Sequence, residues 1–472
     1  MKNIKNLTLL LLAIYVSSCS DDFLSPEPIS AISADTYYSN EAELETGVNN
    51  MYDGLQGIND TQSNSNHGTQ IEYQVTEMRS DNTKTKSSEG EPSQFESFSV
   101  EATNGIVFDY YRSTYNVIYR ANTVLENLDV ASEEAAAQFE GEAKFVRAYC
   151  YFNLVRLYGP IPFIDKVITP ADKEAQFTRV DESTIYALIV GDLQTAVANL
   201  DNSNTARASK AAAQALLAKV HLTLGNYADA QGLCESVIGT GLFSLQDNFK
   251  DVFFNERNSE IIFAIEYRAD DTGDSQNFSA EWLNAVGRSS GLNYVTDEAK
   301  AALDAMGGNR TLYSYRVDAK QPNFNQVVKY LPNGDEGLGI APTSGDPTLA
   351  GNDWIVLRYA DVLLMHVEAV MAGGDGTSGT SALNSFNEVR VRAGLDEVSS
   401  ISKQELLDER RVELAFENQR LFDLIRMGVA QEVLGQFAAD NGFSFSTTDL
   451  LLPIPQAEIG ISAGLLTQNP GY

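Results

Sequence analysis

The sequence is poor in the residues that build metal sites and disulfides. Its 472 residues contain three cysteines, three histidines and two tryptophans. The histidines, at positions 67, 221 and 366, lie far apart and show no metal-ligand spacing, so neither a zinc site nor any cofactor is predicted. Cys150 and Cys234 each lie on an apolar helical stretch, which favours two buried thiols over a disulfide.

Known catalytic signatures are also missing. The chain contains no HExxH, no GxSxG, no Gly-rich phosphate loop and no clustered Cys/His set. Their absence does not exclude an enzyme, but it removes the most specific indications of one.

Long apolar runs are absent except at the N-terminus. There a short basic start precedes an apolar run from Leu7 to Val16, which is too short to span a bilayer and is typical of a secretory signal. We therefore predict a signal peptide over residues 1–18. No other stretch reaches about 18 apolar residues, so the rest of the chain is expected not to cross a membrane as a helix.

A cysteine directly follows the predicted signal. Val16-Ser17-Ser18-Cys19 resembles a lipobox, in which the cysteine is diacylated after the preceding segment is removed. This pattern predicts lipidation at Cys19 and attachment to a membrane through the lipid. The alternative is an ordinary cleaved signal that leaves Cys19 as a free thiol.

Basic residues are scarce, with 33 Lys and Arg against 65 Asp and Glu. The net charge of −32 becomes −34 once the two lysines of the signal are removed. Such a surface repels nucleic acid and anionic lipid headgroups, so no nucleic-acid partner is expected. It also disfavours a sulfated or uronate-rich ligand unless a basic pocket or metal ion compensates, although solubility in a saline environment explains most of the charge.

Most of the sequence has the pattern of amphipathic helices. Apolar residues recur at steps of three or four over 111–128, 145–155, 185–200, 213–224, 359–370 and 382–393. A long charged helix is expected from about Lys403 to Arg426. Within 214–237, residues including Ala218 and Ala230 have tetratricopeptide-repeat spacing, in which small side chains let paired helices approach closely. Because such pairs must stack to bury their faces, we expect about four of them.

Two regions lack the helical signal, a polar loop at 59–104 and a loop-rich stretch at 241–352 with one strand-like run from Ile261 to Tyr267. Both keep aromatic residues that disordered tails tend to lack, so we expect ordered, functional loops. The prediction is therefore a mainly α fold of tetratricopeptide-like helix pairs. It consists of an N-terminal helical region at 19–240, a variable insertion with short strands at 241–352, and a C-terminal helical region at 353–472.

Motifs along nearly the whole mature chain carry a family resemblance. The main segments are Asp22-Phe23-Leu24, Met51-Tyr52-Asp53-Gly54-Leu55, Glu142 to Ala148, Arg358 to Met365, Glu409 to Glu417 and the ending Gln468-Asn469-Pro470-Gly471-Tyr472. Together and in this order they resemble the SusD/RagB family of nutrient-binding outer-membrane lipoproteins. Ser20-Asp21-Asp22 is similar to the signal that sends Bacteroidetes lipoproteins to the cell surface.

The resemblance implies a function without catalysis. It predicts a lipoprotein on the outer membrane, facing the exterior, that captures an oligosaccharide or polysaccharide and delivers it to a SusC-like TonB-dependent transporter. In this family the ligand surface is usually built from the loops after the first helix and from the central insertion. Two alternatives are a helical-repeat scaffold that binds only the transporter and a glycoside-active enzyme.

Sugar binding requires exposed aromatic faces beside polar side chains, because the C–H face of a pyranose packs on a ring while its hydroxyls need hydrogen bonds. The irregular regions supply the predicted ligand-binding residues, which are Trp282, Tyr294, Tyr73, Arg79, Asp81 and Asn82. For each aromatic residue the alternative is a small core beneath the loop. Trp354 lies beside a scaffold motif and is expected to serve packing.

Glu409, Glu413 and Glu417 follow one another at steps of four. They are either paired carboxylates of a glycosidase or members of a buried ion network. We favour the network, because the resemblance puts this helix in the scaffold. The expected partners are Arg410, Arg411 and Arg420, with Arg390 or Arg392. His221 and His366 lie on apolar helical faces and are expected to be core histidines.

Overall fold

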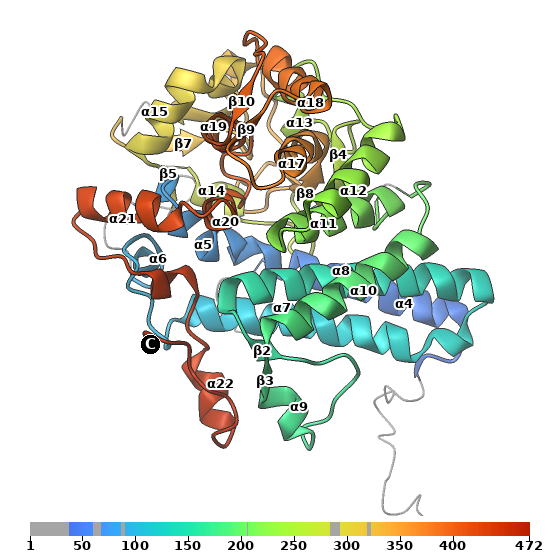
Figure 1. The fold of residues 1–472 in the computed structure, drawn as a ribbon. Helices are drawn as coiled ribbons and strands as arrows, with labels where there is room; N and C mark the ends of the chain where they lie inside the picture. Colours follow the sequence, from blue (N-terminus) through green and yellow to red (C-terminus); the bar gives the residue numbers. More distant parts are fainter. Residues whose placement is uncertain (1–36, 60–67, 86–89, 205, 284–292, 319–321) are drawn as a thin grey trace, which may run out of the picture.

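The computed structural model describes residues 37–59, 68–85, 90–204, 206–283, 293–318 and 322–472 (Figure 1). The predicted signal peptide, Cys19 and His67 lie outside these residues. None of the described helices combines the length and apolarity needed to cross a bilayer.

Eight of the described helices pack in chain order, each against the next. They are α4 (Glu41–Gln56), α7 (Gly105–Glu126), α8 (Glu133–Tyr158), α10 (Glu182–Asn199), α11 (Lys210–Thr223), α12 (Tyr227–Gly239), α17 (Tyr359–Met371) and α18 (Thr380–Arg392). Figure 1 shows them as a stack of pairs that begins with α4 and α7 and ends with α17 and α18. The predicted mainly α fold, with four helix pairs among the described residues, is confirmed.

Local sequence sets the ends of these helices. The Asn104 side chain accepts the N–H groups of Ile106 and Val107 and so caps the start of α7. Gly159, with φ 70°, ends α8 in a conformation that a side chain would strain. Ala218 and Ala230 are fully buried where α11 packs on α12, as repeat spacing predicts.

The predicted continuous helix from Lys403 to Arg426 is wrong. Six residues separate α19 (Lys403–Glu413) from α20 (Arg420–Arg426). Between them Phe416 and Asn418 adopt positive φ angles of 67° and 59°, and both donate their backbone N–H groups to the Glu77 carboxylate at 3.2 and 3.0 Å. The break therefore depends on a residue more than 300 positions away in the sequence.

The remaining helices are shorter. They are α5 (Glu72–Val75), α6 (Ser93–Glu96), α9 (Lys173–Phe177), α13 (Asp251–Phe254), α14 (Phe278–Glu281), α15 (Asp297–Met306), α16 (Thr311–Ser314), α21 (Ala430–Asp440) and α22 (Gln456–Ile461). α15 lies in the predicted insertion and was missed. Its signal was readable, since the Thr296 side chain caps an acidic first turn that leads into an alanine-rich segment.

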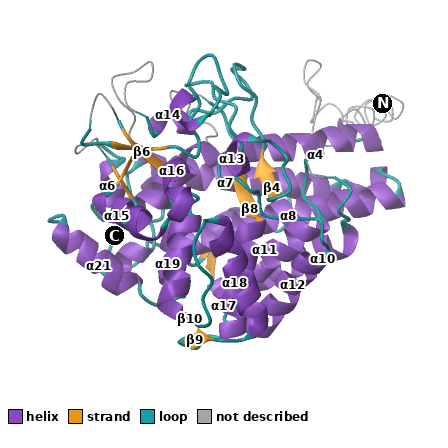
Figure 2. Ribbon diagram, turned by 90° about the horizontal axis from the view of Figure 1, so that it is seen from above, coloured by secondary structure: helices purple, strands orange, loops and turns teal. Residues whose placement is uncertain are grey.

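The strands form small antiparallel sheets. β1 (Thr83–Lys84), β5 (Tyr294–Val295), β7 (Asn325–Val327) and β6 (Tyr315–Val317) form one sheet in this order, and β4 (Ile261–Ile265) pairs with β8 (Trp354–Arg358). β2 (Ile161–Pro162) pairs with β3 (Arg179–Val180), and β9 (Gly376–Thr377) with β10 (Ile401–Ser402). The predicted strand at 261–267 is confirmed as β4. In Figure 2 many of the loops lie along one edge of the molecule, opposite the helices α17 and α18.

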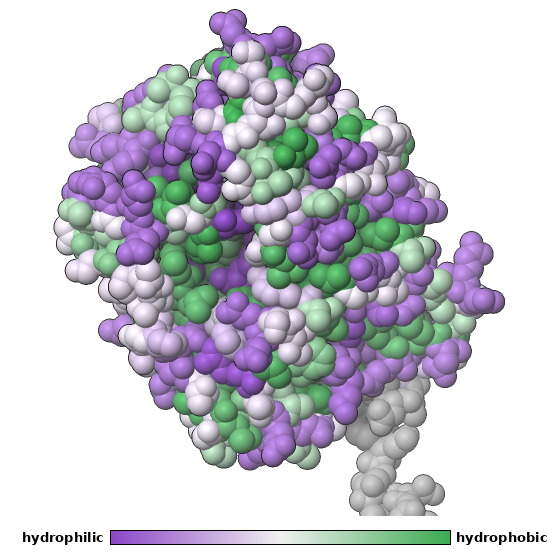
Figure 3. All heavy atoms as spheres, viewed as in Figure 1, coloured by the Kyte–Doolittle hydropathy of each residue, from purple (hydrophilic) through white to green (hydrophobic). Residues whose placement is uncertain are grey.

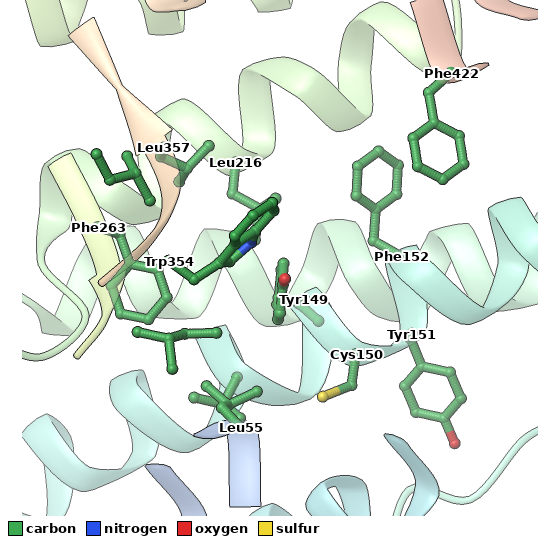
Figure 4. Packing of buried hydrophobic residues seen from close by; sticks show 14 of the residues in the cluster. Leu55, Tyr149, Cys150, Tyr151, Phe152, Leu216, Phe263, Trp354, Leu357 and Phe422 are labelled. Atoms are coloured by element: carbon green, nitrogen blue, oxygen red, sulfur yellow. The ribbon is translucent and has the colours of Figure 1, made fainter. Parts of the chain in front are cut away.

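The main core lies where the helix stack meets the β4–β8 pair. Figure 4 shows Leu55 of α4, Leu216 of α11, Phe263 of β4 and Trp354 of β8 converging on α8. Trp354 is 4% exposed, so its predicted packing role is confirmed. Cys150 and Cys234 are buried free thiols, again as predicted.

Candidate functional site

The six residues predicted to contact ligand are all buried. Among the aromatic residues, Trp282 is 1%, Tyr294 0% and Tyr73 2% exposed. Among the polar ones, Arg79 is 2%, Asp81 4% and Asn82 1% exposed. The predicted exposure of these residues is wrong, and none presents a face on which a sugar ring could lie.

Long-range packing explains the burial of the aromatic residues. Trp282 meets Tyr73, Tyr330 and Phe416 edge-to-face, with ring centroids 5.8, 5.3 and 6.0 Å away. Tyr294 lies in β5 against Phe324, at 5.0 Å between centroids. Tyr73 and Trp282 therefore belong to the main hydrophobic core and not to a small separate core beneath a loop, which was the alternative interpretation.

Ion pairs explain the burial of the polar residues. Asp81 accepts from Arg420 at 2.8 Å and forms an ion pair with Arg411 at 2.9 Å. The Asn82 side chain also accepts from Arg411, and Arg79 donates to backbone carbonyls. The contacts of Asp81 and Asn82 with these arginines therefore connect the early loop to α19 and α20.

The three glutamates lie in a buried ion network. The Glu413 carboxylate accepts from Arg310 at 2.7 Å, from Arg358 at 2.6 Å and from Arg392, and its side chain is 0% exposed. Burial opposes its ionisation, but the charges of the three arginines lower the pKa of Glu413 well below its ordinary value. A carboxylate held ionised in this way cannot donate a proton, so the structure supports the network.

The partners differ in part from those predicted. Arg390 binds Glu409 and Arg392 binds Glu413, as expected. Glu409 also binds Arg310, while Glu417 binds Lys329 and Arg358. Arg410, Arg411 and Arg420 pair instead with Asp361 and Asp423 or with Asp81. The prediction that these three arginines neutralise the glutamates is wrong, because they point to carboxylates on other elements.

One histidine has neighbours of the kind found in a hydrolase. His366 Nδ1 lies 2.8 Å from Ser385 Oγ, and Nε2 lies 3.5 Å from Glu235. Ser385 is only 5% exposed, however, which closes its hydroxyl to a substrate, and burial lowers the pKa of His366. His366 and His221 are both buried core residues, as predicted.

A hydrophilic hollow is visible near the middle of the face in Figure 3, beside α8, α11 and α20. The small cavity between these helices has a volume of about 30 Å³. That space accommodates a water molecule and not a sugar ring.

A much larger cavity, of about 460 Å³, lies on α7, and we call it the α7 cavity. This volume falls within the range of roughly 300–1,000 Å³ usual for ligand pockets. Its apolar walls are Ile58, Tyr111, Tyr115, Tyr119, Ile164 and Ile168. Its polar lining consists of Arg112, Ser113, Asn116, Arg120, Gln176 and Glu458.

Two rows along α7 supply half of this lining. Tyr111, Tyr115 and Tyr119 repeat at steps of four, and Arg112, Asn116 and Arg120 repeat at the same step one residue later. Since residues four apart share a helical face, each row forms a continuous stripe. The tyrosine stripe runs from buried to exposed, because Tyr111 is 4% and Tyr119 43% exposed.

Hydrogen bonds hold the stripes in place. The rings of Tyr111 and Tyr115 lie 4.8 Å apart, and the Tyr115 hydroxyl donates to the carbonyl of Pro162 at 2.9 Å. Arg120 donates to Asp53 at 2.8 Å and to Asn116 at 2.9 Å. The cavity wall is therefore ordered before any ligand arrives.

Two tyrosines of the lining, Tyr111 and Tyr115, are neutral near pH 7. Burial raises the pKa of both Tyr111 and Tyr115 above the ordinary value. Burial also raises the pKa of Glu458, while the charge of Arg112 acts to lower it. Glu458 is the only carboxylate among the described residues that line this cavity, so the paired acids of a glycosidase are not found there.

Sequence reasoning treated Tyr111 and Tyr115 as core stripe only. The readable signal was the continuation of the row to Tyr119 together with the neighbouring Arg and Asn row, a combination that a purely structural helix face does not need. The described residues contain no cluster of His, Cys, Asp and Glu able to hold a metal ion.

Comparison with known proteins identifies the family. Residues 293–472 match the model described as the SusD family, and residues 22–222 match the model described as starch-binding associating with outer membrane. The chain belongs to the SusD/RagB family. The boundaries of the insertion at 241 and 352 stay a prediction.

SusD-like relatives match over most or all of their length. SusD-like protein P2 of Formosa agariphila is 26% identical, with 100% of each chain covered. The starch-binding protein SusD of Bacteroides thetaiotaomicron is 24% identical, with 77% of this chain and 78% of that protein covered. The similarity to SusD-like relatives therefore extends over most or all of this chain.

Solved SusD-like structures share the fold. A laminarin-binding SusD-like protein matches with a TM-score of 0.76 and 26% identity, over 92% of this chain and 100% of its own. Surface glycan-binding protein A of Bacteroides thetaiotaomicron, solved with laminarihexaose, matches with a TM-score of 0.75 and 21% identity, over 91% of this chain and 99% of its own. SusD-like proteins are binding proteins and not enzymes, so the prediction of a non-enzymatic protein is confirmed.

Proposed function

We propose that this SusD-like protein is a cell-surface lipoprotein that captures an oligosaccharide in the α7 cavity and delivers it to a SusC-like TonB-dependent transporter. The observation that carries the proposal is the tyrosine stripe beside the Arg and Asn stripe in a 460 Å³ cavity. Ring faces pack against the C–H face of a pyranose, and fixed amides and guanidinium groups bind its hydroxyls.

The position of the cavity agrees with the family pattern. Ile58, which lines it, directly precedes the polar loop at 59–104. The resemblance assigns ligand binding to the loops after the first helix. The cavity therefore borders the region that the family expectation selects.

The relatives indicate which sugars to test first. One solved SusD-like protein binds laminarin, and a curated relative binds starch. Both are neutral glucans, which suits a chain of net charge −32. Glucans of both linkages are the first probes.

Calorimetry of a soluble form that starts at Ser20 tests ligand capture. The panel contains laminarihexaose, maltohexaose and the corresponding mannan, xylan and chitin oligomers. Tyr119→Ala should weaken binding about tenfold or more, because one exposed stacking face is lost. Tyr472→Ala is the matched control, since Tyr472 is 37% exposed, lines none of the cavities described above, and should leave affinity unchanged.

Each outcome distinguishes among the hypotheses. Equal binding by the parent and Tyr119→Ala would place the sugar outside the α7 cavity. If no glycan bound while the lipidated protein still co-purified with a transporter, the protein would be a scaffold for the transporter alone.

Anchoring is tested separately. Cys19→Ala should release the protein from the membrane fraction. Replacing Asp21 and Asp22 by Ala should leave it lipidated but facing the periplasm, which protease shaving of intact cells detects. A Cys19→Ala protein that stayed with the membrane would contradict the lipoprotein assignment.

A further inference from the structure

Tyr119 and Arg120 line the α7 cavity. Both residues also line a second cavity of about 220 Å³. It lies between α7 and the helix α4, which pack side by side (Figure 1), and we call it the N-terminal cavity. The two cavities are therefore neighbours that share these two side chains.

The N-terminal cavity has its own aromatic wall. Tyr37 is 36% exposed and meets Tyr38 edge-to-face at 4.9 Å between ring centroids. Tyr38 lies directly against α4 at Gly47, where a Cβ atom would come within 2.8 Å of its ring. Glycine at this position thus lets the Tyr38 ring lie on the helix, and a second ring surface follows the one on α7.

The junction between the cavities is fixed in place. Arg120 donates to the backbone carbonyl of Asn50 at 2.6 Å, in addition to its bonds with Asp53 and Asn116. The Tyr119 side chain, which is 43% exposed, lines both cavities together with this arginine. A ligand that leaves one cavity for the other therefore passes over an ordered aromatic and polar surface.

The charged residues along the two cavities form pairs of opposite charge. Arg120 forms an ion pair with Asp53 at 2.8 Å, and the charge of Arg112 acts on Glu458 across the α7 cavity. A carboxylate or sulfate on the ligand would have to compete with Asp53 or approach Glu458, at a cost that ligand hydroxyls do not incur. This local balance favours an uncharged ligand.

From these observations we propose that the ligand is an uncharged oligosaccharide chain that lies across Tyr119 and Arg120 and occupies both cavities at once. This inference rests on the proposed function, since it extends the same site. It adds a second subsite, a minimum length and a charge class for the ligand.

A length series tests the second subsite. The probes are laminaribiose and laminarihexaose, or the same pair of lengths from whichever neutral glucan binds in the panel. The hexasaccharide should bind about tenfold more tightly than the disaccharide, because it alone reaches the second ring surface. Thr123→Trp should fill the N-terminal cavity and reduce the affinity for the hexasaccharide about tenfold, without weakening that for the disaccharide.

Thr195→Trp is the matched control. Thr123 and Thr195 are both half-buried on long helices, and each hydroxyl donates to the carbonyl four residues earlier. Tyr37→Ala, compared with Tyr472→Ala, provides a second pair of variants that needs no larger side chain. Equal hexasaccharide affinity in the parent, Thr123→Trp and Tyr37→Ala would overturn the second subsite.

A charge series tests the ligand class. The probe is the same hexasaccharide with its primary alcohols oxidised to carboxylates, which changes charge but not linkage. The parent should bind it at least tenfold more weakly than the neutral form, and Asp53→Asn should narrow that ratio several-fold by removing the competing carboxylate. Tighter binding of the oxidised probe by the parent would overturn the uncharged class.

Different results would contradict the proposed function of the α7 cavity and the second subsite. If Tyr119→Ala bound every oligomer like the parent, the proposed function of the α7 cavity would fail, and the second subsite with it. If Tyr119→Ala weakened binding while the hexasaccharide and the disaccharide bound equally well, only the second subsite would fail.

Discussion

The buried ion network around Glu413 and the lining of the α7 cavity both contain arginines paired with carboxylates. The two regions differ in how far these charges are exposed to solvent. In the network, Glu260, Arg310, Arg358 and Glu413 have side chains at most 1% exposed, and the charges face only one another. At the cavity, the lining residue Arg120 and its partner Asp53 on α4 have side chains 20% and 60% exposed. Removing one partner from the buried network leaves the other charges desolvated and uncompensated, whereas solvent access leaves Arg120 able to bind a ligand.

This difference explains why family motifs are poor guides to the ligand site. Arg358, Glu409, Glu413 and Glu417 lie in motifs that carried the resemblance, and the structure buries all four in the network. The cavity instead uses Tyr119 and its neighbours on α7, of which only Arg120 lies in such a motif, Arg120-Ala121-Asn122. The motifs identify the scaffold, and exposure identifies the candidate site.

Removing Arg358 from the buried network is expected to cost more stability than any other change proposed for this protein. Arg358→Met would leave Glu260, Glu413 and Glu417 without their shared partner and should lower the free energy of unfolding by about 3–5 kcal/mol, as measured by urea denaturation. Arg257→Met is the control, because Arg257 binds Glu266 through two hydrogen bonds but is 57% exposed. Its loss should cost about 0–1 kcal/mol. Equal losses in the two variants would show that burial does not set the value of these pairs.

A smaller loss is expected from neutralising one carboxylate of the network. Glu413→Gln keeps the shape of the side chain and should lower the free energy of unfolding by on the order of 1–3 kcal/mol. Glycan affinity, measured at a temperature where the variant is folded, should equal that of the parent. Lost affinity with unaltered melting would move the site to α19.

The helical part of the fold was predictable because its signal is local. Burial of one face imposes a period of 3.6 residues, so the stripes on α7, α8, α10 and α11 were found from sequence. The break between α19 and α20 was not, because the Glu77 carboxylate that stabilises it comes from the early loop. Helix periodicity contains no information about such a distant partner.

The residue types sought in the sequence, aromatic rings beside amides and guanidinium groups, also line the α7 cavity. Their position was not predicted, because exposure was assigned to Trp282 on the ground that it lies in an irregular region. Its neighbours Tyr73, Tyr330 and Phe416 come from three distant segments, and only the folded structure brings them together. Tyr119 was overlooked because its row begins in the core.

The pKa of a second buried carboxylate, Asp353, is shifted in the direction opposite to that of Glu413, and a pH experiment can detect the difference. Asp353 is largely buried and accepts the backbone N–H of Tyr267, and burial, with Glu256 and Glu266 nearby, raises its pKa to about 7. The folded state thus binds this proton more tightly than the unfolded state, whose pKa is about 3.9, so stability is lost as pH rises between these values.

Asp353→Asn removes this titration while keeping an oxygen that can accept from Tyr267. The free energy of unfolding of the variant, minus that of the parent, should rise by on the order of 2 kcal/mol between pH 5 and pH 8. It should stay level at higher pH, and urea unfolding measures both. A difference that did not change with pH would show that Asp353 titrates normally. Glu413→Gln should show no such rise, because the pKa of Glu413 is lowered and both states are ionised in this range.

The most direct test of the central claim is a crystal structure of the soluble protein with the tightest-binding oligosaccharide of the panel. Sugar rings are predicted against Tyr115 and Tyr119 in the α7 cavity, with hydroxyls bound to Asn116 and Arg120. Sugar bound elsewhere, for example over the insertion at 241–352, with an empty α7 cavity would contradict it.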